Sequence, residues 1–246
     1  MPSVLLVFGE GAARAALGND LIQVRLFQPA GPVNVTVYYE SLCPDSIKFY
    51  INQLYPTMEI TNLSTKVSLE LIPYGKSQYT RADDGSLTFT CHHGERECYG
   101  NKVHACALNI LTSKRERLSY LNCLLGSMLK DRQAVFPADK CAEDVGIGAQ
   151  LPQIIECANK TQGNELLAEM GNKTQLLQPK LTSVPTVVFN NKYDQNDFKD
   201  SQTNFKGVLC KYISPKPAEC AGLNGSTTLA ASVLLLLSST ALFVFQ

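Results

Sequence analysis

The sequence predicts an α/β fold in which a long helical insertion separates a strand-helix-strand unit from a later strand and helix. An apolar, β-branched run at 33–39 is followed by a helical pattern and then by an alternating run at 66–72. Two helical regions, at 101–131 and about 151–177, occupy the middle of the chain. A proline then precedes the apolar run 187–189, which is typical of a strand that begins at an X-Pro bond.

The first unit consists of a strand, a helix and a second strand. A helix is predicted over 44–58 because its apolar residues recur on one face: Ile47, Tyr50, Ile51 and Leu54. The run 66–72 alternates polar and apolar residues and is closed by Pro73 and Gly75. Strand, helix and strand with this spacing predict a right-handed crossover between parallel strands.

The remaining elements are less regular. Residues 74–100 are polar and rich in turn formers, so we expect a loop there. The helical region 151–177 contains Gly163 and Gly171, which we expect to interrupt it. The last part of the domain is predicted to hold a strand, a turn at Asn190-Asn191, a short strand to Asp194 and a helix over 202–212.

Composition indicates a protein of the secretory pathway. The chain has 246 residues, enough for one domain with an insertion, and its 22 basic and 22 acidic residues argue against a nucleic-acid partner. Nine cysteines without Cys-x2-Cys pairs favour an oxidising compartment. Five asparagines lie two residues before Ser or Thr and are predicted glycosylation sites: Asn34, Asn62, Asn159, Asn172 and Asn224.

Both ends of the chain are expected to lie outside the folded domain. Residues 1–30 are interpreted as a weak or incomplete signal or leader, because the apolar core at 4–8 is short. Within 221–246, the uncharged stretch 229–245 has 17 residues and would span about 26 Å as a helix. Small residues just before it favour a GPI-type anchor signal, with a retained membrane span as the alternative.

Cys43 is the candidate nucleophile. It stands where the first strand ends, and Pro44 suits the first position of the helix that follows. Unpaired N–H groups and the macrodipole at a helix N-terminus stabilise a thiolate. We therefore predict that Cys43 is a free, exposed thiol, that Ser46 donates a hydrogen bond to its thiolate, and that the charge of Asp45 opposes this.

The other eight cysteines are predicted to form disulfides, since the odd total favours one free thiol. They are Cys91, Cys98, Cys106, Cys123, Cys141, Cys157, Cys210 and Cys220. Only Cys210 with Cys220 is a specific pairing expected from the short loop between them. Residues 91–106 also hold three histidines, but their spacing differs from common zinc motifs, so we predict no metal site. The histidines are expected to be solvated or structural, or to titrate at mildly acidic pH.

The order of elements resembles the thioredoxin fold, with Cys43-Pro44-Asp45-Ser46 at the active-site position and Val184-Pro185 at the position of the cis-proline loop. A longer match lies at Cys91-His92-His93-Gly94-Glu95-Arg96-Glu97-Cys98-Tyr99-Gly100-Asn101-Lys102-Val103-His104-Ala105-Cys106. It resembles the signature Cys-Gln-His-Gly-x2-Glu-Cys-x2-Asn-x2-Glu-x-Cys of the gamma-interferon-inducible lysosomal thiol reductase (GILT) family. His92 replaces the Gln, and His104 replaces the second Glu. The resemblance covers about 33–220.

The resemblance implies a thiol reductase domain at 31–220, with a helical, disulfide-stapled insertion at about 76–180. It also implies disulfide-containing or unfolded proteins as substrates, and an endosomal or lysosomal, extracellular or cell-surface location. Family members generally carry Cys-x-x-Cys, whereas this chain has Ser46 at the second position. We therefore predict that Cys43 reacts alone and that an external thiol such as cysteine or glutathione resolves its mixed disulfide, with no bound cofactor. Val184 and Pro185 are expected to bind the substrate backbone.

Two other classes of function remain open from the sequence. One is a non-catalytic thioredoxin-like module that holds partner proteins, or traps them as mixed disulfides because no second cysteine resolves them. The other is a surface-displayed interaction protein that uses the disulfide-stapled insertion and is anchored at its C-terminus.

Overall fold

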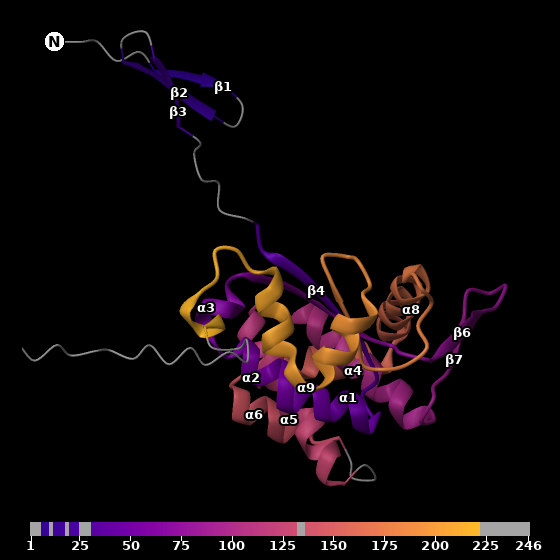
Figure 1. The fold of residues 1–246 in the computed structure, drawn as a ribbon. Coiled ribbons are helices and arrows are strands. Elements are labelled where there is room, and N and C mark those ends of the chain that lie inside the picture. Colours follow the sequence, from indigo (N-terminus) through magenta and orange to yellow (C-terminus); the bar gives the residue numbers. More distant parts are fainter. Residues whose placement is uncertain (1–5, 10–11, 18–19, 25–30, 132–135, 222–246) are drawn as a thin grey trace, which may run out of the picture.

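The structure, a computed structural model, describes residues 31–131 and 136–221 in full and the backbone of three N-terminal strands. These strands, β1 (Leu6–Gly9), β2 (Ala12–Leu17) and β3 (Asp20–Val24), form an antiparallel sheet of their own in the order β1-β2-β3 (Figure 1). They lie in the segment for which the sequence predicted only a leader.

The domain is built on a three-stranded sheet in the order β5-β4-β8. Its strands are β4 (Val33–Tyr39), β5 (Val67–Pro73) and β8 (Thr186–Phe189). The central strand β4 pairs parallel with β5 and antiparallel with β8. The parallel pair is the one that the strand-helix-strand spacing predicts.

The crossover between β4 and β5 is helical but not a uniform α-helix. It contains α1 (Pro44–Phe49), the π-helical segment η1 (Tyr50–Leu54), α2 (Tyr55–Met58) and the short α3 (Thr61–Ser64). Pro56 has no N–H and cannot continue the α-helical hydrogen-bond ladder. The Tyr55 N–H donates to the Tyr50 carbonyl, five residues back, so a π-type bond widens the helix just before the proline.

The sheet is covered on both faces, which is why β4 is buried along almost its whole length (Figure 1). Val35 and Val37 belong to a core cluster that includes Ile47 from α1 and Phe205 from α9 (Gln195–Tyr212). Tyr38 belongs to a second cluster, with Ile72 and with Leu167 from α8 (Thr161–Leu176). Alternate side chains of β4 therefore enter different cores.

The insertion contains a hairpin and five helices among the described residues. They are β6 (Gln78–Arg81), β7 (Leu87–Thr90), α4 (Glu95–Ile110), α5 (Lys114–Lys130), α6 (Ala138–Val145), α7 (Leu151–Asn159) and α8. The predicted loop over 74–100 is therefore wrong where it contains this hairpin and the start of α4. The hairpin projects from the body of the domain (Figure 1), so most of its side chains are exposed and its composition resembles that of a loop.

The predicted interruptions at Gly163 and Gly171 are also wrong, because both residues lie inside α8 and the chain breaks at Lys160 instead. A Cβ at Gly163 would lie 2.5 Å from the Cys157 carbonyl oxygen, and one at Gly171 would lie 2.8 Å from the Tyr74 ring. These glycines permit close packing against α7 and Tyr74 without ending the helix.

The last helix begins earlier than predicted. Asp194 caps α9, since its carboxylate accepts hydrogen bonds from the N–H groups of Asn196 (2.8 Å) and Asp197 (2.9 Å). The expected strand up to Asp194 is reduced to a single bridge between Phe189 and Lys192 around the Asn190-Asn191 turn. A short 3-10 turn, η2 (Ala218–Cys220), follows α9.

Four disulfides hold the domain. They join Cys91 to Cys98, Cys106 to Cys157, Cys123 to Cys141, and Cys210 to Cys220. Three of the bridges lie wholly within the insertion, and the fourth ties the end of α9 to η2. Covalent links therefore hold the helices of the insertion together in addition to their apolar contacts.

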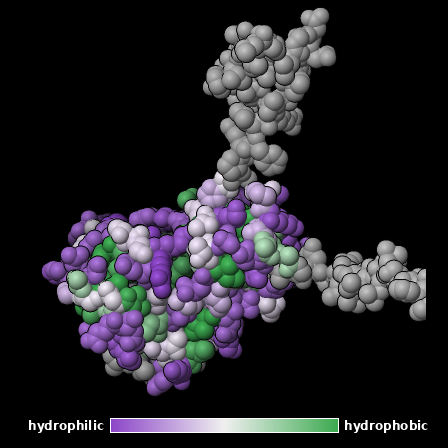
Figure 2. Space-filling model, turned by 90° about the vertical axis from the view of Figure 1, so that its left-hand side faces the viewer, coloured by the Kyte–Doolittle hydropathy of each residue, from purple (hydrophilic) through white to green (hydrophobic). Residues whose placement is uncertain are grey.

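The surface of the domain is mainly hydrophilic with scattered apolar areas, as one face shows in Figure 2. The large apolar side chains that stand out are Leu129, 43% exposed, and Leu176, 80% exposed. Within the part of the chain that the structure describes, no helix has both the length and the apolar character needed to cross a bilayer. The predicted anchor signal or span at 229–245 lies outside the described residues.

Candidate functional site

Cys43 occupies the junction between β4 and α1. Its backbone is extended, with φ −69° and ψ 122°, and it is the N-cap residue of α1, with Pro44 at the first helical position. Its carbonyl accepts the first helical hydrogen bond, from the Ile47 N–H at 3.0 Å. The local sequence produces this geometry because Pro44 has no N–H to leave unpaired and its fixed φ suits a helix start.

The segment before β8 lies on the Cys43 sulfur. The Val184–Pro185 peptide bond is cis, and Cys43 Sγ lies 3.9 Å from the Val184 carbonyl oxygen. Cys43 is only 8% exposed. The expectation of an exposed thiol is therefore wrong, because a segment 141 residues later in the chain covers it. The thiol is nevertheless free, since no disulfide includes it.

A groove runs beside the thiol. It has a volume of about 450 Å³ and lies between the first turns of the crossover helix, the Val184-Pro185 segment and α9. Its wall includes Asp45, Phe49, Val184, Pro185 and Gln202. Cys43 itself does not line the groove, but Asp45, two residues later, and Val184, whose carbonyl contacts the sulfur, both do.

Ser46 is held differently from the prediction. Its side chain is buried, with the residue 1% exposed, and its Oγ accepts a hydrogen bond from the Glu40 N–H at 3.3 Å. The expected hydrogen bond from Ser46 to Cys43 is not present among the described residues, and the contact that Ser46 does make is with the backbone just after β4. Asp45 is exposed, so water screens its charge.

The signature residues of α4 hold the turn just after β4 in place. The Ser41 N–H donates to Asn101 Oδ1 at 2.9 Å, and the Ser41 hydroxyl donates to the Glu97 carbonyl at 3.3 Å. A Cβ at Gly100 would lie 2.5 Å from Ser41 Oγ, so a glycine there allows this close approach. The motif at 91–106 thus supports the turn that presents Cys43.

A cluster that the sequence did not predict lies beside this turn. Glu40 Oε2 is 3.3 Å from His92 Nδ1 and 3.4 Å from His93 Nδ1, and Glu97 Oε2 is 2.5 Å from His93 Nδ1. Burial raises the pKa of Glu97, as does the nearby charge of Glu40, while hydrogen bonds and charge from His93 oppose the rise. The sequence does place an acidic residue, Glu40, directly after an apolar strand, which hints at a special role. It could not show the partners of Glu40, because they lie 52 or more residues later in the chain.

Glu40 itself is fully buried and held by the segment after β5. Its Oε1 accepts a hydrogen bond from the Lys76 N–H at 2.8 Å. Gly75 has φ +60°, and a Cβ there would lie 2.3 Å from Glu40 Cγ, so glycine is required both for this backbone conformation and for the contact.

His104 does not belong to that cluster. It is fully buried, and its Nδ1 lies 3.0 Å from the Tyr39 hydroxyl. Burial lowers the pKa of His104 from 6.5 to about 3. His104 is therefore structural, one of the two expected roles, and the alternative of titration at mildly acidic pH does not hold for it.

We expect His104 to make the fold less stable as the pH falls. The pKa is lower in the folded chain than in the unfolded chain, so between about pH 6.5 and 3 only the unfolded chain binds this proton. This group should therefore lower the free energy of unfolding by about 2.5 kcal/mol from pH 7 to pH 4.5. Urea denaturation at pH 7 and pH 4.5 measures this change in the free energy of unfolding. The change should be smaller in His104→Gln, whose amide does not titrate but can still bond Tyr39. Identical pH dependence in both proteins would contradict this prediction.

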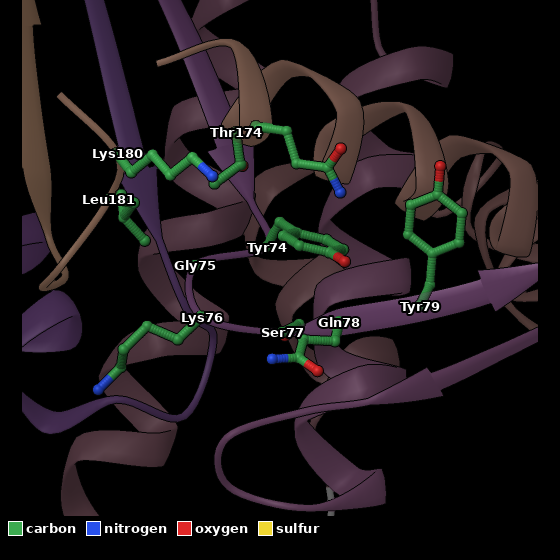
Figure 3. A pocket seen from close by; sticks show the side chains of 10 residues that line it. Tyr74, Gly75, Lys76, Ser77, Gln78, Tyr79, Thr174, Lys180 and Leu181 are labelled. Atoms are coloured by element: carbon green, nitrogen blue, oxygen red, sulfur yellow. The ribbon is translucent and has the colours of Figure 1, made fainter. Parts of the chain in front are cut away.

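A larger cavity is lined in part by Gly75 and Lys76, the residues that contact Glu40. It measures about 720 Å³ and lies between the segment after β5 and the end of α8 (Figure 3). Tyr74 and Ser77 line it with buried hydroxyl groups that have no hydrogen-bond partner among the described residues, and Lys76 and Lys180 add positive charge. It is separate from the groove beside Cys43, since the two share no lining residue.

The predicted glycosylation sites are accessible where the structure describes them. Asn34, Asn62, Asn159 and Asn172 are all exposed, whereas Asn224 lies outside the described residues. Exposure is compatible with a glycan at each of the four positions, and attachment remains a prediction.

Comparison with known proteins agrees with this geometry. The sequence profile of the family described as gamma interferon inducible lysosomal thiol reductase (GILT) matches residues 34–145. A gamma-interferon-inducible lysosomal thiol reductase-like protein of Anopheles gambiae is 43% identical over 222 residues, covering 86% of this chain and 90% of the relative. GILT-like protein 1 of Drosophila melanogaster is 40% identical, over 85% of this chain and 87% of the relative. The gamma-interferon-inducible lysosomal thiol reductase of Mus musculus is 34% identical, over 84% and 79%.

A solved structure shows the same fold at low sequence identity. BdbD from Bacillus subtilis in its oxidised form superposes with a TM-score of 0.50 at 12% identity, over 74% of this chain and 90% of that one. The fold is thus thioredoxin-like, with a helical insertion and several disulfides. Together with the extent and identity of the match to its relatives, this shows that the chain belongs to the gamma-interferon-inducible lysosomal thiol reductase family.

Proposed function

We propose that the protein reduces disulfide bonds in other proteins through Cys43 alone, with an external thiol as the reductant. The observation that carries the proposal is the state of the cysteines. Eight of the nine are bridged, and the one free thiol caps a helix N-terminus beside a groove. Membership in a thiol reductase family supports the same chemistry.

The reaction balances without a second cysteine in the protein. The Cys43 thiolate attacks one sulfur of the substrate disulfide, a mixed disulfide forms, and the other substrate sulfur leaves as a thiolate. An external thiolate, from cysteine or glutathione, then attacks the substrate sulfur or the Cys43 sulfur of that bond, and a second external thiol reduces the new mixed disulfide that results. Cys43 is thereby returned to its thiol form. The substrate gains two electrons and two protons, and two external thiols become one disulfide.

The Val184-Pro185 segment supplies the binding surface in this proposal. The Val184 N–H donates no hydrogen bond to any residue that the structure describes, and its carbonyl accepts only the weak bond from Cys43. An extended substrate segment in the groove can pair with these backbone groups, as in strand addition to a sheet edge. Hydrogen bonds to the backbone do not depend on the side chains of the substrate. This mode of binding therefore suits disulfide-containing or unfolded proteins of many different sequences.

The setting that best fits the protein is the secretory pathway, ending in lysosomes. Four disulfides require an oxidising compartment during folding. The mammalian and fish relatives are named as lysosomal thiol reductases. We infer the same destination for this chain.

A second function is favoured by one observation. Position 46 holds a buried serine engaged by Glu40, so a mixed disulfide at Cys43 has no internal route to resolution. If external thiols are excluded by the covering Val184 segment, the protein would hold its partners covalently without turning over.

One experiment separates the two functions. The protein is mixed with a disulfide substrate without external thiol, quenched by alkylation and analysed by mass spectrometry. We expect one substrate adduct per chain on Cys43, and none in Cys43→Ala. Millimolar cysteine or glutathione should then release the adduct and sustain turnover. An adduct that persists in excess thiol would favour the trapping function, and absence of any adduct would contradict both.

A further inference from the structure

Glu40, His92 and His93 bring one carboxylate oxygen and two imidazole nitrogens together beside the end of β4. Glu40 Oε2 lies 3.3 Å from His92 Nδ1 and 3.4 Å from His93 Nδ1. All three ligand atoms lie within 4.8 Å of one another. In a tetrahedral zinc site with bonds of about 2.0 to 2.2 Å, neighbouring ligand atoms are about 3.3 to 3.5 Å apart. Two of the three distances already have this length.

The charges around the cluster also favour a dication. Glu40 and Glu97 are both fully buried, and Glu97 Oε2 lies 2.5 Å from His93 Nδ1. Glu40 lies against His92 as well as His93, so two buried carboxylates share two imidazoles. Buried negative charge of this kind is costly away from water unless positive charge accompanies it. A bound dication would balance both carboxylates.

We propose that Glu40, His92 and His93 form a zinc site. Zinc is favoured over magnesium or calcium because two of the three ligands are imidazole nitrogens. Glu40 is buried, whereas the His92 side chain is 46% exposed, so an ion reaches the site from solvent past His92 and keeps one coordination position for water. The ion takes the place of the protons that otherwise join these atoms, as metal binding to histidine requires, and it displaces Glu97 Oε2 from its 2.5 Å contact with His93 Nδ1.

The proposed site is independent of thiol chemistry. Cys91 and Cys98, the nearest cysteines in sequence, are joined in a disulfide and offer no thiolate. Cys43 is not one of the three residues of the proposed site. The ion would instead cross-link the end of β4 to the segment between β7 and α4. Failure of the reductase proposal would therefore leave this one standing.

Lys76 provides a further test of the position. Its Nζ lies 3.3 Å from His92 Nε2 and places a positive charge beside the proposed ion. Removal of that charge should strengthen zinc binding, because like charges a few ångströms apart repel even when partly screened by water.

Zinc affinity of the full chain is measured by competition with a chromophoric chelator. We expect one zinc ion per chain, with Cys43→Ala binding within about twofold of wild type. His92→Gln and His93→Gln should each weaken binding about 100-fold or more, since loss even of groups that only support a ligand costs 10- to 100-fold. Lys76→Gln should tighten binding about fivefold.

Circular dichroism of each variant shows whether it is folded before binding is compared. Three results would overturn the proposal: no zinc binding by wild type, unchanged affinity in both folded histidine variants, or loss of binding in Cys43→Ala. The last result would place the metal on the thiol instead. A Lys76→Gln variant with weaker binding would also contradict the position.

Discussion

Ser46→Cys should shorten the lifetime of the mixed disulfide at Cys43 by about 100-fold or more. Positions 43 and 46 are the N-cap and the third residue of the same first helical turn, so their side chains are neighbours. A thiol held there attacks from within the molecule, at an effective concentration far above millimolar external thiol. Single-turnover reduction of a disulfide substrate, followed by alkylation and mass spectrometry, measures the lifetime.

The same variant should also change the dependence on external thiol. Reduced Ser46→Cys should release both substrate thiols without added reductant, once per chain, and end with a disulfide between Cys43 and the introduced sulfur. Ser46→Ala is the matched control, and its adduct should persist as in wild type because no sulfur is introduced. An adduct on Ser46→Cys that lasts as long as on wild type would contradict the placement of these two side chains in one reactive pair.

Removal of the Cys106–Cys157 bridge, as Cys106→Ala with Cys157→Ala, should lower the free energy of unfolding by about 4 kcal/mol. This bridge joins α4 to α7 and closes a loop with a sequence separation of 51 residues. A long loop gains much conformational freedom in the unfolded chain when the bridge is lost, which stabilises the unfolded state. Both cysteines are replaced together so that no new thiol is free to exchange.

The bridge between Cys210 and Cys220 supplies the comparison. Its sequence separation is only 10 residues, so its removal should cost about 3 kcal/mol. Urea denaturation of wild type and the two double variants gives both differences in free energy. A larger loss from the short loop than from the long one would show that packing around the bridges, rather than loop closure, dominates.

Local pattern was sufficient for the elements around Cys43. The apolar run of β4, the proline after Cys43 and the alternation in β5 specify a strand, a helix start and a second strand from neighbouring residues alone. Local pattern failed where exposure or packing overrides composition. The β6–β7 hairpin is polar because it is exposed, and the glycines of α8 serve contacts with α7 and Tyr74.

The sequence by itself determined the strand-helix-strand unit, the cysteine at a helix N-terminus and the serine three residues on, since each depends on residues adjacent in the chain. The tertiary structure decided that Val184 covers the thiol, which cysteines pair, and that Glu40 meets two histidines. The bridge between α4 and α7, the Glu40–His92 contact and the Cys43–Val184 contact join residues 51, 52 and 141 positions apart. Only the packing of the whole domain brings such distant segments together, and no local preference specifies it.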